Sequence, residues 1–285
     1  MEGTSAGGRA SNSSDSRWRS YTLTSQVFLR YLSAIFFVAF ASLWVQLPGL
    51  LHENGILPVK ILLKQSKIKD FSSGLDVLRT YPSVVVLADY FKAIDADTAL
   101  DAACIVGMAA ALLSLTRGGR TGLMLIQWAL YLSLFIVGQT FLQFQWDVLL
   151  LEVGFASIFL APWRKGRSEE EERPPLSALY LVRWVLFKLM FQSGVVKIQA
   201  DCPTWKKLTA CHYHFATQCI PTPLAWYFNQ MPSILLKISV AATLWIEIAC
   251  SILIIIPFTG VQKVAAVPQI ILQVRRLQML FRSGN

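Results

Sequence analysis

Charged residues are scarce in this 285-residue sequence, since Asp, Glu, Lys and Arg together make up 15% against about 25% in an ordinary soluble domain. Hydrophobic residues make up 54%, and the mean hydropathy is +0.49. The apolar runs are too long and too rarely interrupted for the core of a soluble domain. The lack of charge therefore excludes an ordinary soluble protein and predicts that lipid surrounds much of the chain.

Several sequence motifs that indicate particular folds or binding sites are also missing. The sequence has no internal repeat, no coiled-coil heptad and no glycine-rich phosphate loop, and Gly118-Gly119 is only a turn signal. The cysteine and histidines of residues 211–214 lack CxxC or HxxxH spacing, so we expect no metal site. The net charge of +9 comes from basic residues at the ends of apolar runs, as at Arg117 and Arg120. We therefore expect no cofactor and no nucleic-acid partner.

Long apolar runs are what the sequence does contain. Runs of about 17 to 25 residues are long enough to cross a bilayer as helices, and they lie at 27–47, 98–115, 122–142, 178–198 and 234–257, with a shorter span at 148–162. A further run, 264–273, is too short and is followed by Arg275 and Arg276. The pattern predicts an all-α, polytopic transmembrane helix bundle of about six spans with an incomplete seventh.

Charge and composition between the runs predict the domain organisation. Residues 1–26 are rich in serine and have no apolar core, so we expect a disordered cytosolic tail and no cleavable signal peptide. Residues 27–257 form the transmembrane domain. The positive-inside rule assigns loops 48–97 and 199–232 to the opposite, lumenal side. Residues 258–285 are an incomplete or atypical carboxy-terminal segment, and the short run 84–91 is expected to lie at the interface or pack on the bundle.

Ionisable residues inside the predicted spans are candidate site residues because each is costly in hydrocarbon, at about 2.5 to 3.5 kcal/mol near a helix centre. They are Asp101, Asp147, Glu152, Arg183, Lys188, Lys197 and Glu247. The main interpretation is that they pair with one another between helices, and the alternative is a buried polar site. Asp147 is predicted to cap the start of its helix, and Glu152 to pair with Arg183 or Lys188.

Polar and aromatic motifs in residues 40–58, 138–155 and 182–223 resemble the lipase maturation factor family. The resemblance covers about residues 27–257 in order. It implies a multi-pass protein of the endoplasmic reticulum membrane that assists folding, assembly and maturation of secreted lipases and is not an enzyme. Its implied partners are the lipid bilayer and lipase clients bound through the lumenal loops.

The same resemblance bears on the lumenal loop at 199–232. The residues alone leave three pairings open for the three cysteines of this loop. Cys202 and Cys219 match family cysteines and Cys211 does not, so the resemblance implies a Cys202–Cys219 disulfide. Tyr213 and His214 belong to a family motif and are expected to order the loop through hydrogen bonds.

Two departures from the family pattern stand out. The family usually has Tyr-Glu after this histidine, where this chain has Phe215-Ala216, which removes a carboxylate and weakens the case for a client-binding role of the loop. Family members also continue into a large carboxy-terminal lumenal domain that this sequence does not contain.

Two other function classes remain open. The stretch from Ser193 to Lys197, with Trp205 downstream, is similar to the span of vitamin K-dependent carboxylases that carries their basic lysine. This alternative makes the chain a membrane enzyme with Lys197 as a base, whereas a lysine at the end of a span can instead snorkel to the headgroups. A transporter, the third hypothesis, is expected to have paired broken helices, which the sequence does not indicate.

Overall fold

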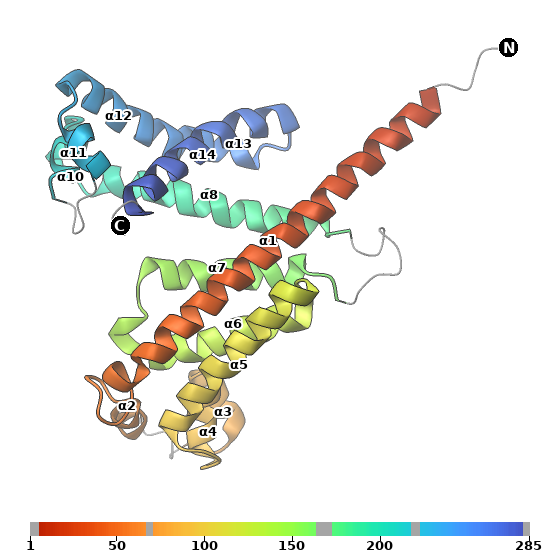
Figure 1. Ribbon diagram of the computed structural model, residues 1–285, viewed down its shortest axis with the longest axis vertical. Coiled ribbons are helices and arrows are strands. Elements are labelled where there is room, and N and C mark those ends of the chain that lie inside the picture. The colour runs from red at the N-terminus through yellow and green to blue at the C-terminus, as the bar shows by residue number, and fades with distance from the viewer. Residues whose placement is uncertain (1–5, 67–70, 164–172, 218–222, 282–285) are drawn as a thin grey trace. The chain divides into compact units, whose positions relative to one another are not determined.

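The computed structural model describes residues 6–66, 71–163, 173–217 and 223–281, and these residues form helices joined by short loops without a strand (Figure 1). The chain divides into two compact units, residues 1–179 and 180–285. The helical architecture confirms the predicted all-α membrane fold.

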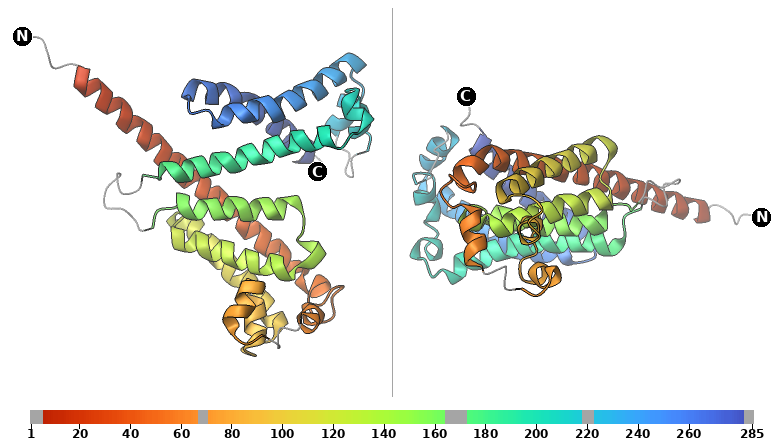
Figure 2. Two further views of the ribbon diagram at one scale, coloured as in Figure 1. Left: turned by 180° about the vertical axis from the view of Figure 1, so that it is seen from behind. Right: turned by 90° about the horizontal axis from the view of Figure 1, so that it is seen from below.

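The first unit is built on four long helices. They are α1 (Ala6–Leu50), α5 (Ala96–Arg117), α6 (Thr121–Val137) and α7 (Gln145–Leu160). α1 packs along α5, α5 on α6, and α6 on α7 (Figure 2). The connection from α1 to α5 contains the short helices α2 (Val59–Gln65), α3 (Gly74–Thr80) and α4 (Val84–Tyr90), and a 3-10 turn, η2 (Gln139–Phe141), precedes α7.

α1 begins earlier than expected. The sequence predicts a disordered tail up to residue 26, whereas the helix starts at Ala6. No proline lies between its start and Pro48, so nothing in the backbone stops the helix from extending backwards from its packed apolar half. Pro48 lies in the last turn, and the helix ends at Leu50.

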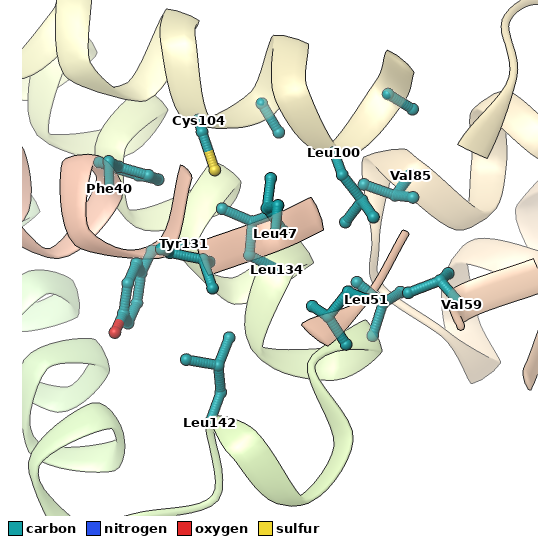
Figure 3. Packing of buried hydrophobic residues seen from close by; sticks show 14 of the residues in the cluster. Phe40, Leu47, Leu51, Val59, Val85, Leu100, Cys104, Tyr131, Leu134 and Leu142 are labelled. Atoms are coloured by element: carbon teal, nitrogen blue, oxygen red, sulfur yellow. The ribbon is translucent and has the colours of Figure 1, made fainter. Parts of the chain in front are cut away.

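Aliphatic and aromatic side chains together form the buried core of the first unit (Figure 3). Tyr131 of α6 meets Phe36 and Phe40 of α1 edge-on, at centroid distances of 5.8 and 5.6 Å. The short helix α4 buries Val85 and Val86 in the same cluster. This confirms that residues 84–91 pack on the helix bundle.

The second unit contains the other long helices. They are α8 (Leu176–Gln199, whose first turn belongs to the first unit), α12 (Ser233–Trp245), the π-helical turn η3 (Ile246–Cys250), α13 (Ser251–Ile255) and α14 (Thr259–Phe281). Between α8 and α12 lie the short helices α9 (Pro203–Lys206), α10 (Ala210–His214) and α11 (Pro223–Asn229). The short run predicted at 264–273 is part of the 23-residue α14, which continues through Pro268.

Four helices in the described parts of the chain are long and apolar enough to cross a membrane. They cover Tyr21–Leu50, Ala96–Arg117, Leu176–Gln199 and Ser233–Ile255. Helices lie at the other two predicted spans as well, but α6 has 17 residues and α7 has 16. At 1.5 Å per residue they are about 25 Å long, shorter than the ~30 Å of hydrocarbon.

Candidate functional site

A carboxylate without exposed surface, that of Glu247 in η3, lies at the centre of the second unit's polar site. Nζ of Lys197 in α8 donates hydrogen bonds to its Oε2 at 2.6 Å and its Oε1 at 2.8 Å. The Lys197 side chain is 18% exposed. Because an isolated charge in such surroundings would cost several kcal/mol, each of these two residues requires the other.

Ser193 and Trp205 complete the surroundings of the ammonium group. Nζ of Lys197 also donates to Oγ of Ser193 at 2.9 Å and to its carbonyl at 3.0 Å, while that hydroxyl donates to Oε1 of Glu247 at 3.2 Å. The Trp205 ring centroid lies 5.4 Å from Nζ, within the range of a cation–π contact. The Lys197 side chain therefore has polar or aromatic contacts on several sides.

Local sequence explains how α8 and η3 come so close. Ser193 and Lys197 are four residues apart and share one face of α8. Between them, Gly194 has no side chain, and a Cβ at that position would meet Cγ1 of Ile248 at 2.6 Å and Cβ of Glu247 at 3.1 Å. On the other side, Oγ of Ser251 donates to the Glu247 carbonyl at 2.5 Å. A π-helical turn in an α-helix often marks a functional site.

The prediction that charges inside the spans pair between helices is confirmed for Lys197 and Glu247. Sequence analysis included Glu247 among the costly charges but did not connect it with Lys197. The available signal was composition alone, because Glu247 is the one acidic residue between Asp201 and the end of the chain.

Asp147 forms a second buried polar contact, in the first unit. The helix cap is Phe144, which makes no side-chain capping bond, so the predicted capping role of Asp147 is wrong. Asp147 lies in the first turn and is 5% exposed, and its Oδ1 accepts a 2.6 Å hydrogen bond from the Tyr131 hydroxyl. Its Oδ2 is buried without a hydrogen-bond partner among the described residues. The carboxylate still lies near the positive end of the α7 dipole.

The predicted pairing of Glu152 with Arg183 or Lys188 stays a prediction. Glu152 is half-buried on α7 in the first unit, whereas Arg183 and Lys188 belong to α8 in the second. The Arg183 guanidinium lies 5.3 Å from the ring centroid of Tyr180, and Lys188 is exposed.

Residues of the loop motif help to order α10. The Tyr213 carbonyl accepts hydrogen bonds from the backbone N–H and the hydroxyl of Thr217, both at 2.9 Å, while its ring is exposed. The ring of His214 packs edge-on against Phe215. A contact that sequence analysis missed joins Nε2 of His212 to Oγ of Ser233 at 3.2 Å and so connects α10 with the start of α12.

The cysteines of the loop differ in their surroundings. Sγ of Cys202 lies 3.0 Å from Oγ1 of Thr204, and this hydrogen bond lowers the pKa of the Cys202 thiol. Burial raises the pKa of Cys211. Both thiols are free in the structure, and Cys219 lies outside the described residues, so the implied Cys202–Cys219 bridge stays a prediction.

A cluster of charges lies between the end of α1 and the start of α5. Nζ of Lys60 lies 2.8 Å from Glu53, 3.3 Å from Asp95 and 3.9 Å from Asp97. The hydrogen bond with Glu53 is the main reason that the pKa of Lys60 rises to about 12. These charges define a polar end of the first unit.

Comparison with known proteins gives a consistent result. The family model described as "Lipase maturation factor transmembrane domain" matches residues 23–285. Lipase maturation factor 2 of Gallus gallus is 41% identical over 91% of this chain and 36% of its own length, and that of Homo sapiens is 40% identical over 92% and 38%. Lipase maturation factor 1 of Mus musculus is 34% identical over 74% and 37%. The chain thus spans little more than a third of the length of these relatives, and no solved structure matches it.

Proposed function

Because this chain belongs to the lipase maturation factor family, we propose that it resides in the endoplasmic reticulum membrane and assists the folding, assembly and maturation of secreted lipases. The similar proteins are named lipase maturation factors. The four apolar helices fit a membrane-embedded factor. Its partners in this proposal are the lipid bilayer and lipase clients, which bind on the lumenal side.

The observation that carries a non-enzymatic role is the engagement of Lys197. A general base needs a free lone pair, whereas the N–H groups of Lys197, at most three, are shared among four acceptors: both carboxylate oxygens of Glu247 and two oxygens of Ser193. The pair joins α8 to η3, and the chain between these two elements consists of the 199–232 segment and α12. It supports a structural role, as a brace that holds this part of the chain in place.

The proposal is tested in cells that lack the endogenous factor and secrete an inactive lipase. Expression of this chain is expected to raise the activity of the secreted lipase per unit of lipase antigen. The matched control is the double variant Lys197→Ala, Glu247→Ala, which lacks the brace and is expressed at the same level as the wild-type chain. The proposal fails if the wild-type chain is present in the endoplasmic reticulum membrane and the specific activity of the lipase does not rise.

A further inference from the structure

Most of the segment assigned to the lumenal loop lacks charged residues. From Leu208 to Leu236 the sequence contains no Asp, Glu, Lys or Arg. At the 15% charge of the whole chain, a stretch of that length would carry several such residues. A loop that lies in water has no reason to exclude them, whereas a segment in contact with lipid does.

The position of the ion pair gives a second, independent argument. Lys197 lies half a turn before α8 ends at Gln199, whereas all 13 residues of α12 precede Glu247. α12 therefore extends about 20 Å along its own axis from the level of the pair, and α8 stops close to it. The helices α10 and α11 lie beside the first part of α12.

The surface of α12 shows what surrounds this stretch. Ser233–Ile255 has a hydropathy of 2.2, the highest of the four candidate spans. Ile234, Leu235 and Ile238 in its first half are 63%, 45% and 56% exposed. If the bilayer ended at the level of the pair, these side chains would face water. Lipid must therefore reach beyond the end of α8, to the level of α10 and α11.

The side chains of helices α10 and α11 suit a position at the level of the lipid headgroups. Phe215 and Ala225 pack with Leu236 of α12 in a small apolar cluster, and Figure 1 shows α10 and α11 gathered at one end of α12. Trp226 and Tyr227 of α11 point outwards, 62% and 64% exposed. Trp and Tyr are the residues enriched at the headgroup level of membranes.

We propose that residues 208–217 and 223–232, with the first turns of α12, form an interfacial element that lies among the phospholipids of one leaflet, with Trp226 and Tyr227 in contact with lipid. The partner is the lipid surface rather than water or a protein. Lys206 and Asp201, an exposed ion pair, mark where the chain returns to water. This inference is independent of any lipase client.

Site-specific photocrosslinking tests the contact with lipid. The full chain is expressed with a diazirine amino acid at Trp226 or at Tyr227, in microsomes that contain radiolabelled phosphatidylcholine. Ile252, exposed within the α12–α13 span, is the lipid-facing control position, and Lys206 is the aqueous control. After illumination, the labelled lipid bound to the purified chain is measured for each position.

Yields at Trp226 and Tyr227 are expected to approach that of Ile252 and to exceed that of Lys206 several-fold. Yields as low as that of Lys206 overturn the proposal, as does crosslinking mainly to another protein, which would identify a protein-binding surface instead. A high yield at Ile252 in the same membranes shows that the chain is inserted, so a low yield at Trp226 and Tyr227 is not a failure of folding.

Discussion

At the scale of single residues, the Lys197–Glu247 pair dominates the second unit because it places two full charges in poorly solvated surroundings. The value of such a pair lies less in its net stabilisation than in the cost of losing one partner. Surface pairs behave differently, since water and salt screen them. The chain offers one of each kind for comparison: Lys197 with Glu247, and Lys206 with Asp201.

Lys197→Met is expected to destabilise the protein by about 3 to 5 kcal/mol because it removes the positive charge that compensates the buried Glu247 carboxylate. The double variant Lys197→Met, Glu247→Leu should recover most of this loss, since no charge is then left. Lys206→Met, at the exposed pair, should cost about 1 kcal/mol or less. Thermal unfolding of the detergent-solubilised chain measures all three. Equal effects of Lys197→Met and Lys206→Met would contradict the buried brace.

Lys197→Arg separates a brace from a base. Arginine keeps the positive charge and can bind a carboxylate with two hydrogen bonds, but it does not lose a proton at neutral pH. We expect insertion and lipase maturation to stay nearly intact, as measured by the specific activity of the secreted lipase, with Lys206→Arg as the control. Normal expression with complete loss of function would instead favour the carboxylase-like enzyme.

Cys202 and Cys219 are predicted to be bridged, with about 3 kcal/mol of stabilisation for a loop of that size. Mass mapping after alkylation without reduction should find Cys211 modified and the other two protected. After reduction, Cys202 should react faster than Cys211 near pH 8, because its lowered pKa gives more thiolate while burial raises the pKa of Cys211. Alkylation of both Cys202 and Cys219 before reduction would disprove the bridge.

At the scale of elements, close helix contacts depend on residues without side chains. α1 and α5 approach at Gly107, where a Cβ would lie 2.6 Å from atoms of the fully buried Phe40 ring. Small residues commonly permit such approaches between membrane helices. The same role falls to Gly194 between α8 and η3.

Gly107→Ala is expected to lower the thermal stability of the chain, because overpacking costs about 1 to 3 kcal/mol and exceeds the gain in helix propensity of about 0.5 to 1 kcal/mol. Gly122→Ala is the matched control, since a Cβ in that position of α6 meets nothing within 4 Å. The thermal stability of the Gly122→Ala control should stay unchanged or rise slightly. Equal melting temperatures for the two variants would show that α1 and α5 do not pack this closely.

At the scale of the whole molecule, orientation follows from the distribution of basic residues, which predicts residues 163–177 in the cytosol and 199–232 in the lumen. A glycosylation sequon on a flexible insertion of about 20 residues after Lys207 should be modified in microsomes. The same insertion after Ser168 should stay unmodified. The opposite pattern would reverse the orientation of the chain.

The sequence by itself determined the helical class, the membrane environment and the positions of the six predicted helices, because run length and hydropathy are local properties of the chain. Boundaries were less certain: α1 extends back to Ala6 and α14 on to Phe281, since a helix continues until a competing contact or a breaker ends it.

Only the tertiary structure decided which charges meet. Glu247 is separated from Lys197 by 50 residues, and Tyr131 from Asp147 by 16. Hydrophobic periodicity reports which face of a helix is apolar, but not which residue of another helix lies opposite. That choice depends on close packing at particular residues such as Gly194, where an absent side chain lets η3 approach and brings the carboxylate to the lysine.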